Sequence, residues 1–375
     1  LPPKSPLRCN PRWVSLFVKM THGNGVRTQK LAPRGATVKR ILVTGFEPFG
    51  ASNVNVSQDA VLALEESMLC EDPWSSQREI PDARIHTLLE REILTVDQKG
   101  SQRTAQRIAE GEQWDGILHI GVCGTCTTPH LEQRAQDLLH MEMPDNSGRQ
   151  EQSMPLSGEG DLMSTAPINV WLQNWHTDAQ VSSDAGTYIC NETLYRSLQA
   201  LGDTSVPCFF LHLPKAETYP FEKSMNVVHQ VLARMAHKPV MSVAGAVFID
   251  DGRFLIARRA EHEAHSGTWE FPGGKLEPQE TPHSAIEREI DEEFGWMVQA
   301  QESIGTWWHH FPSVTIALNA ILCTFDGDFP SFEVKERWTS HDRVEWHTVH
   351  SSSILDFTGS DQHIAAALLD LGHLN

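Results

Sequence analysis

The stretch from Thr281 to Gly295 constrains the fold more tightly than any other part of the chain, because it carries the signals of a complete helix. Thr281 is a favoured N-cap, and Pro282 suits the first helical turn. Gly295 is a residue type that commonly ends helices. Apolar side chains recur every four positions, as in a helix that packs one face on a core: Ile286, Ile290 and Phe294. The sequence therefore predicts one amphipathic helix here.

Three glutamates share a second stripe of the same helix. Glu289, Glu292 and Glu293 stand at positions i, i+3 and i+4. Like charges at this spacing each destabilise a helix by roughly 0.2–0.5 kcal/mol. A divalent cation would offset this repulsion, and carboxylate oxygens favour Mg²⁺, with Mn²⁺ as the alternative ion. The other interpretation is a solvated acidic face that pairs with Arg288.

The surrounding sequence favours the cation, because it resembles the Nudix box. Gly274 is followed after five residues by Glu280 and, after seven more, by Arg-Glu-apolar-x-Glu-Glu-x-Gly-apolar. The resemblance covers residues 241–375. It implies an α/β/α sandwich with a mixed sheet and the hydrolysis of a nucleoside diphosphate linked to another group. It also implies the following roles: Glu292 and Glu293 as metal ligands, Glu289 as ligand or base, Arg288 as the residue that orients it, Gly273 or Gly274 as a carbonyl ligand, and Glu345 as an additional ligand.

The flanks of this pattern resemble the MutT-type diphosphatases, which clear oxidised guanine nucleotides such as 8-oxo-dGTP. Arg258-Arg259-Ala260 and residues 267–274 carry this resemblance. Asp361 stands where these enzymes often have an Asn that reads the base, so the preferred base stays open. Phe311 and Leu318 are candidates to pack the base, with core packing as the alternative. The residues expected to bind the nucleotide are Arg259, Phe271, Phe311 and Asp361.

The N-terminal part holds a second set of chemical groups. Cys190 follows a Gly-containing turn and precedes a helical run, a position where the helix dipole favours a thiolate. His212 lies at the end of an apolar strand predicted over residues 206–213. A Cys, a His and a carboxylate together make an activated thiol. Taken singly, a buried Cys and a buried His more often have structural roles.

Several segments together resemble the pyroglutamyl peptidase I family of cysteine peptidases, over about residues 39–235. The segments that carry the resemblance are residues 44–50, 143–148, 184–195 and 209–214. The resemblance implies these roles: Cys190 as nucleophile, His212 as base, Glu132 as the residue that orients the base, and Phe46 and Phe49 as the walls that sandwich the lactam ring of an N-terminal pyroglutamate.

The chain departs from that family beside the expected pocket. Val122 replaces a Gln that helps to line the pocket, Cys126 replaces an Arg, and Glu142 replaces a basic residue. These changes indicate an altered substrate or a weak activity. Cys123 and Cys126 form a CxxC, but no second ligand pair accompanies them. We interpret them as loop thiols rather than as a zinc site.

Length and patterning predict two α/β domains. A single core rarely grows past roughly 250–300 residues, and this chain has 375. The expected fold class is two α/β/α sandwiches, each around a mixed sheet. Residues 57–69 and 221–236 have helical spacing, and Asp251-Gly252 is a hairpin signal. The expected divisions are a basic, disordered leader over 1–38 with Met20 as an alternative start, a peptidase-like domain over 39–236, a linker over 237–240 and a Nudix domain over 241–375.

Charge and cysteine usage exclude several classes of protein. Residues 1–40 hold nine of the 30 Lys and Arg residues and none of the 49 Asp and Glu residues, so the remainder carries a net charge of −28. Such a body repels nucleic-acid polymers. No apolar run of about 18 residues occurs, so we expect no membrane span. Seven sparse cysteines do not form a disulfide framework, which favours a reducing cytoplasm.

Three functions fit this sequence. The first is a bifunctional enzyme that acts on a nucleotide substrate and on pyroglutamyl peptides. The second keeps the diphosphatase and makes the N-terminal domain an inactive binding or stabilising module. The third is a nucleotide-sensing module without catalysis, which the three glutamates disfavour. The oligomeric state is open.

Overall fold

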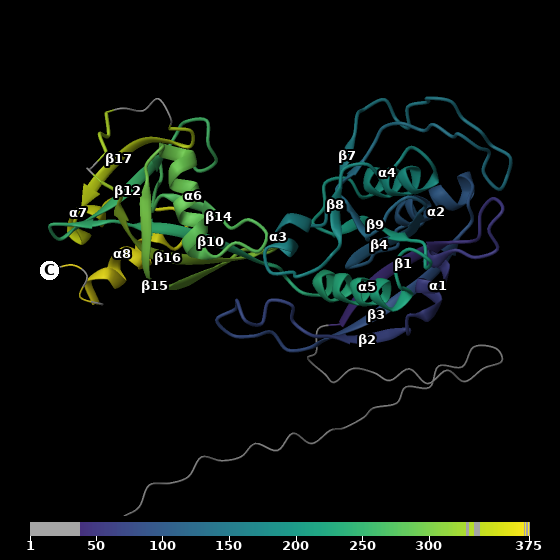
Figure 1. Ribbon diagram of the computed structural model, residues 1–375, viewed down its shortest axis with the longest axis horizontal. Coiled ribbons are helices and arrows are strands. Elements are labelled where there is room, and N and C mark those ends of the chain that lie inside the picture. The colour runs from purple at the N-terminus through teal and green to yellow at the C-terminus, as the bar shows by residue number, and fades with distance from the viewer. Residues whose placement is uncertain (1–37, 328–329, 334–337, 371, 373, 375) are drawn as a thin grey trace, which may run out of the picture.

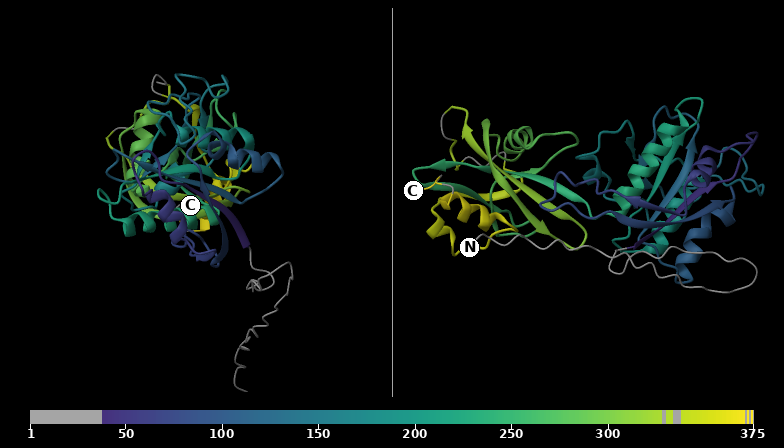
Figure 2. Two further views of the ribbon diagram at one scale, coloured as in Figure 1. Left: turned by 90° about the vertical axis from the view of Figure 1, so that its right-hand side faces the viewer. Right: turned by 90° about the horizontal axis from the view of Figure 1, so that it is seen from below.

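The computed structural model describes residues 38–327, 330–333, 338–370, 372 and 374. Two α/β bodies lie end to end along the long axis of the molecule (Figures 1 and 2). Of the leader expected over residues 1–38, only Val38 is among the described residues. Within the described part of the chain, no helix is long and apolar enough to span a membrane.

The N-terminal body is built on one mixed, seven-stranded sheet. Strand pairing is parallel except between β2 and β3 and between β5 and β9. The central strands are buried along most of their length, as predicted for the apolar runs. In spatial order the strands are β2 (Ser67–Cys70), β3 (Ile85–Leu94), β1 (Val38–Phe46), β4 (Gly116–Cys123), β9 (Cys208–Pro214), β5 (His130–Glu132) and β8 (Gln180–Ser182).

Helices cover both faces of this sheet and so form the predicted three layers. Two apolar clusters fill the space between the layers, one on each face. On one face lie α1 (Val56–Ala63), α3 (Ile168–Leu172) and α5 (Phe221–Ala236). On the other face lie α2 (Gln98–Ala109) and α4 (Ile189–Leu201). The chain between β5 and α3 contains a separate pair of short antiparallel strands, β6 (Arg134–Ala135) and β7 (Leu162–Met163).

The helix predicted over residues 57–69 is shorter than expected. Asn55 caps α1, and the helix ends at Ala63. Met68, expected on the apolar helical face, lies instead in strand β2, where it pairs with Thr87 of β3. Backbone pairing with a strand distant in sequence has therefore overridden a local helical pattern.

The C-terminal body contains two small sheets. One has the order β14 (Gly273–Lys275), β10 (Val240–Val247), β16 (Thr315–Phe325) and β15 (Val298–His310). The other contains β11 (Ile249–Asp250), β12 (Arg253–Arg259), β13 (Trp269–Glu270) and β17 (His341–His347). Helix α6 (Pro282–Phe294) covers one side, α8 (Asp361–Asp370) covers the other, and α7 (Val349–Ser352) is a single turn.

Two local predictions in this body are confirmed. Thr281 caps α6, and Gly295 ends it in the left-handed conformation. The three apolar side chains predicted to face the core are buried: Ile286, Ile290 and Phe294. At the predicted hairpin, Asp251 and Gly252 both have positive φ, as a tight turn between β11 and β12 requires.

The two bodies meet through specific backbone contacts. The side chain of Gln173, just after α3, accepts a hydrogen bond from the backbone N–H of Ser242 (2.9 Å) and donates to the carbonyl of Leu276 (2.7 Å). Trp308 of β15 donates its indole N–H to the carbonyl of Gln77 (2.9 Å). Val240 at the start of β10 is fully buried in the same apolar cluster as α5. The junction is therefore packed rather than open.

We expect Gln173→Ala to lower the free energy of unfolding by about 1–3 kcal/mol, because it leaves the buried N–H of Ser242 without its acceptor. Urea unfolding followed by tryptophan fluorescence measures this change. Gln133→Ala is the matched control, since that amide bonds Asn169 at the surface. Equal stability of the two variants would contradict a role for Gln173 at the junction.

Candidate active sites

Cys190 occupies the first turn of α4, directly beside strand β4. A Cβ added to Gly121 would lie 3.1 Å from the Cys190 sulfur and 2.6 Å from the ring of Phe210. Only glycine therefore fits at this position of β4. The thiol consequently lies between the helix start and the centre of the sheet, as the sequence predicted for a residue that follows a turn.

His212 and Glu132 lie on neighbouring strands. Strand β9 pairs antiparallel with β5, with His130 opposite His212 and Glu132 opposite Phe210. The His212 Nδ1 atom and a Glu132 carboxylate oxygen are 2.7 Å apart, and both side chains are buried. His212 also hydrogen-bonds Cys190. The structure therefore brings together the three residues that the sequence named.

Two opposing effects set the pKa of His212. Burial lowers it, while the hydrogen bonds to Cys190 and then to Glu132 raise it, and the result is a pKa of about 9. The imidazole is therefore protonated at neutral pH. A protonated imidazole beside a sulfur favours a thiolate, which is the reactive form of a cysteine.

Aromatic side chains surround the thiol. Phe46 is buried and stacks with Phe210 (6.2 Å between ring centres), which in turn lies against His212 (4.7 Å). Phe49 is less buried and packs against Tyr188 (5.3 Å), two residues before Cys190. The two phenylalanines predicted to hold a ring thus belong to the same apolar cluster as Cys190.

Polar side chains near Cys190 hold the surrounding loops. The Asn191 amide accepts from the backbone N–H of Gln136 and donates to two loop carbonyls. Arg149 joins the buried Glu192 (2.7 Å) to Asp145 (3.0 Å). Asn146 donates to Glu47, in the turn that carries the two phenylalanines (2.8 Å). These contacts fix the geometry of the site, and sequence reasoning assigned them no role.

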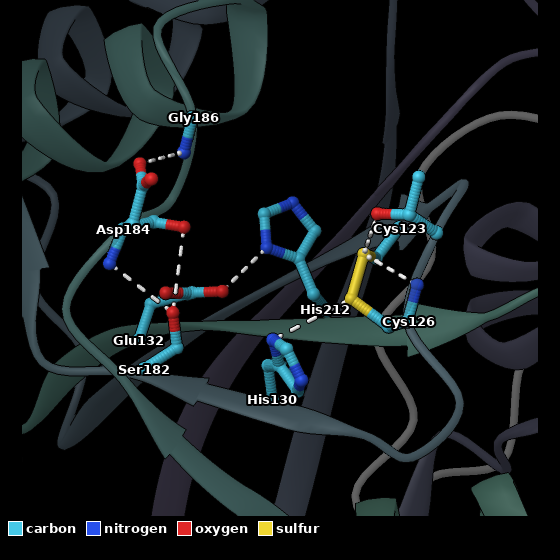
Figure 3. The surroundings of a disulfide bond; sticks show 9 residues. Cys123, Cys126, His130, Glu132, Ser182, Asp184, Gly186 and His212 are labelled. Atoms are coloured by element: carbon cyan, nitrogen blue, oxygen red, sulfur yellow. Dashed lines mark hydrogen bonds and ion pairs between the residues drawn. A yellow bond between two sulfur atoms is a disulfide. The ribbon is translucent and has the colours of Figure 1, made fainter.

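Cys123 and Cys126 form a disulfide (Figure 3). The sequence-based interpretation of both residues as loop thiols was therefore wrong. Their Cα atoms are 5.4 Å apart, within the range that a disulfide spans. Cys126 Sγ also lies 3.4 Å from Nδ1 of His130, the residue opposite His212. The disulfide therefore closes the loop near the imidazole of His212, at the place where the chain departs from the peptidase pattern.

The second site gathers around α6. A Cβ on Gly274 would lie 2.3 Å from the carboxyl carbon of Glu289, and one on Gly273 would lie 2.1 Å from the Ala244 carbonyl. Both positions therefore exclude any side chain. The missing side chains allow the backbone of β14 to approach the glutamate, as a combined carbonyl and carboxylate cation site needs.

Arg288 holds the acidic residues in place. Its guanidinium bonds Glu280 (2.8 Å), Glu289 (3.0 Å) and Glu292 (3.2 Å). The contacts with Glu280 and then Glu289 raise the pKa of Arg288, although burial lowers it. The ion pair between Arg288 and Glu280 explains why a glutamate stands at this distance before Arg288 in the sequence. The contact with Glu289 is the one on which the predicted orienting role of Arg288 depends.

Glu293 is the most deeply buried of the three helical glutamates. Burial raises its pKa to about 7, with further contributions from Glu289 and Glu270. One of its carboxylate oxygens is buried and has no hydrogen-bond partner among the described residues. His341 Nδ1 lies 3.6 Å from that oxygen, and its Nε2 contacts Glu270 (2.9 Å). Sequence reasoning assigned no role to Glu270 or to His341, and His341 lies far from α6 in the chain.

These residues fit a hard divalent cation. The donor set consists of carboxylate and carbonyl oxygens, a buried carboxylate oxygen lacks a partner, and the glycines leave room beside Glu289. Glu345 differs from this group, because its contacts are with Arg343 and His347 (3.1 Å) on its own strand. Among the described residues, Glu289, Glu292 and Glu293 share one stripe of α6, but their ligand atoms do not all lie within 4.8 Å of one another, and Glu345 has other partners.

The residues expected to bind the nucleotide separate into two places. Arg259 bonds Glu270 (2.7 Å), and Asp361 accepts from the backbone N–H of Phe271 (2.7 Å), so these residues adjoin the acidic site. Burial raises the pKa of Asp361 to about 8, so its carboxyl is largely protonated at neutral pH. Phe311 lies elsewhere, in the turn after β15, where its carbonyl accepts from Lys238 (3.1 Å). Leu318, rather than Phe311, shares an apolar cluster with Phe271.

Comparison with known proteins now assigns the family. The family model described as pyroglutamyl peptidase matches residues 39–247. The chain belongs to the pyroglutamyl peptidase family. A NUDIX domain model matches residues 238–368, so a Nudix domain follows the peptidase domain. The two matches overlap at the start of β10, where the bodies are joined.

Two curated relatives support the assignment of the peptidase domain. Pyrrolidone-carboxylate peptidase of Enterococcus faecalis is 30% identical over 183 residues, which cover 47% of this chain and 78% of that protein. The Streptococcus pyogenes serotype M1 enzyme is 33% identical, with 47% and 77% covered. Among solved structures, pyrrolidone carboxyl peptidase from Thermus thermophilus is 30% identical, covers 52% of this chain and 99% of its own, and has a TM-score of 0.42.

Glu132→Gln should lower the pKa of His212 from about 9 by roughly one pH unit or more, because it keeps the hydrogen-bond acceptor and removes the negative charge. The imidazolium persists below this pKa and is lost as the pH rises through it, so the loss should occur at lower pH in the variant. NMR titration of the imidazole measures it, with exposed Glu142→Gln as control. If the pKa of His212 is the same in Glu132→Gln as in the wild type, the negative charge of Glu132 does not raise it.

Proposed function

We propose that the chain is a bifunctional hydrolase. The peptidase domain removes N-terminal pyroglutamyl residues, and the Nudix domain hydrolyses a nucleoside triphosphate with a divalent metal. The observation that carries the first activity is the buried chain of hydrogen bonds from Cys190 through His212 to Glu132. An inactive module would have no need to bury a carboxylate against an imidazole beside a cysteine.

The proposed peptidase reaction follows from these three groups. The thiolate of Cys190 attacks the carbonyl carbon that joins the pyroglutamyl ring to the next residue, and a thioester forms. His212 gives its proton to the departing amine, and Glu132 holds the imidazole in position throughout. His212 then accepts a proton from water, whose oxygen attacks the thioester. The carbon–sulfur bond breaks, pyroglutamate leaves, and the sulfur departs as a thiolate while the proton stays on His212, so the starting pair is restored.

The pocket supports a pyroglutamyl ring as the group recognised. Phe46 and Phe49 belong to the apolar cluster that includes Cys190, and a flat lactam fits between aromatic faces. The family's Gln and Arg are replaced here by Val122 and Cys126, so part of the polar recognition is missing. We therefore propose a weaker or altered preference at the far side of the ring.

A fluorogenic pyroglutamyl amide tests the peptidase. The wild-type chain should release the fluorophore, and Cys190→Ala should abolish release, because Cys190 is the thiol that contacts His212 among the described residues. Cys323→Ala, which removes a buried thiol from the Nudix domain, is the control and should retain release. If wild type and Cys190→Ala are equally silent while both are folded, the N-terminal domain is a binding or stabilising module.

We further propose that the Nudix domain releases pyrophosphate from a nucleoside triphosphate, as MutT-type enzymes do. When bound, Mg²⁺, or Mn²⁺ in its place, would neutralise the phosphates and activate water. Glu289, Glu292 and Glu293 would hold it, with a carbonyl of Gly273 or Gly274. Arg288 keeps the first two glutamates in place. Glu345 is a ligand of the proposed metal site only in a conformation that brings β17 closer to α6.

We propose the preferred nucleobase from the chemistry of Asp361. Its protonated carboxyl can both donate and accept a hydrogen bond, as the Asn of MutT-type relatives can. Oxidised guanine nucleotides such as 8-oxo-dGTP are therefore the first substrates to test, in a survey that includes the normal nucleotides. The backbone N–H of Phe271 donates to the Asp361 carboxyl, and Arg259 forms an ion pair with Glu270, the residue before Phe271.

Glu293→Gln should reduce nucleotide turnover by on the order of 100-fold or more, the usual cost of losing one charge-stabilising group. Pyrophosphate release in the presence of Mg²⁺ measures the rate, and circular dichroism checks the fold. Glu302→Gln, an exposed glutamate on β15, is the control. A variant as active as the control would exclude Glu293 as a ligand.

We also propose the division of the chain at residues 39–236 and 241–375, with residues 237–240 as the connection. Helix α5 ends at Ala236, and β10 begins at Val240. Because the connection is this short and Val240 is buried with α5, neither domain is expected to move freely relative to the other.

A further inference from the structure

Three potential metal ligands converge where the peptidase domain ends. Asp72 and Asp82 lie in the loop after β2, and His237 is the residue that follows α5. One oxygen or nitrogen atom from each lies within 4.8 Å of the other two. The His237 side chain is fully buried and that of Asp72 nearly so, whereas the Asp82 side chain is 45% exposed.

A hydrogen bond orients the His237 ring. Its Nε2 lies 3.0 Å from the carbonyl of Cys70, and a carbonyl only accepts, so Nε2 carries a hydrogen. In the neutral ring, Nδ1 then presents a lone pair. This atom has no hydrogen-bond partner among the described residues. It faces an oxygen of Asp72 at 3.9 Å and one of Asp82 at 3.8 Å.

The unpartnered Nδ1 of buried His237 therefore faces two carboxylate oxygens, each of which has a donor on its outer side: the N–H of Trp74 for Asp72 (3.0 Å) and Arg78 for Asp82 (3.2 Å). No hydrogen bond joins Nδ1 to either oxygen among the described residues. Such an arrangement is unfavourable unless a cation, a proton or a water lies at its centre. The outer contacts match those of a metal site, in which the histidine donates its other N–H to a carbonyl and the carboxylates are themselves hydrogen-bonded. Asp72 accepts from the backbone N–H groups of Trp74 (3.0 Å) and Asp82 (3.1 Å).

Arg78 neutralises part of the negative charge and contacts the same Asp82 oxygen that faces His237. Its guanidinium contacts an oxygen of Asp72 (2.7 Å) and an oxygen of Asp82 (3.2 Å). Two carboxylates and one guanidinium leave a net charge of −1, which still attracts a divalent cation. Arg78 also donates to the carbonyl of Lys238, so it orients the carboxylates from the side of the connecting residues.

We propose that Asp72, Asp82 and His237 bind a divalent transition-metal ion of the zinc class. An imidazole ligand favours zinc over magnesium, and three protein ligands leave a position for water. Bond lengths of about 2.0–2.2 Å require the ligand atoms to approach one another by roughly half an ångström. Half-exposed Asp82 can make this movement. A cavity of about 760 Å³, lined by Asp82 and His237, gives the ion and its water a path of entry.

The position of this site indicates a structural role. His237 begins the connection to the Nudix domain, and the loop of Asp72 and Asp82 also supplies the carbonyl of Gln77 that bonds Trp308 of that domain. An ion here would fasten both segments to the end of α5. Zinc should therefore stabilise the junction without taking part in either reaction.

Zinc binding to the full chain tests the site. The other metal-binding groups are removed or occupied first: Cys190→Ala deletes the reactive thiol, absence of reductant keeps the Cys123–Cys126 disulfide, and millimolar Mg²⁺ fills the Nudix glutamates. Under these conditions calorimetry should detect one zinc ion per chain, and the thermal unfolding temperature should rise with zinc concentration.

Two variants in this background locate the ion. His237→Asn should abolish zinc uptake, whereas His229→Asn, which changes an exposed histidine of α5, should retain it. Asp82→Asn, a milder change at a half-exposed position, should weaken zinc affinity at least tenfold and remain folded. Zinc uptake that is absent from the parent chain, or equal in all three variants, would overturn the proposal. In the first case a buried water or a protonated His237 occupies the centre.

Discussion

The pairing of β9 with its two neighbours is the constraint on which the peptidase site depends. This strand is buried along its whole length, lies parallel to β4 and antiparallel to β5, and so places His212 next to Gly121 on one side and near Glu132 on the other. Because side chains alternate along a strand, a shift of one residue would turn His212 to the opposite face of the sheet. The catalytic geometry is thus a consequence of register.

Both sites also rely on a glycine that lets a reactive side chain approach a strand. Gly121 admits the sulfur of Cys190, and Gly274 admits the carboxylate of Glu289. In each case a helix begins or runs beside the strand and presents the reactive group to the backbone. The two domains have different sheets and different chemistry, but they solve the same packing problem in the same way.

Sequence patterns predicted the elements whose signals are local. The limits of α6 followed from its cap and its terminal glycine, and α5 and β1 followed from periodicity and burial. Patterns failed where distant backbone decides the outcome, as in β2, which continues a helical spacing but pairs with β3. The contact between His341 and Glu293 could not be predicted either, because the two residues are separated by a long hairpin and meet only in the fold.

The disulfide beside His212 has a consequence for how the thiol chemistry of this chain is studied. Cysteine peptidases are handled with added reductant to keep their nucleophile as a thiol, and the same reductant acts on Cys123–Cys126. Exposed Gly124 and Thr125 lie between the two sulfur-bearing residues, so a small dithiol can reach them. A preparation protected in this manner is then a different covalent species from the one described, with a longer free loop bordering its imidazole.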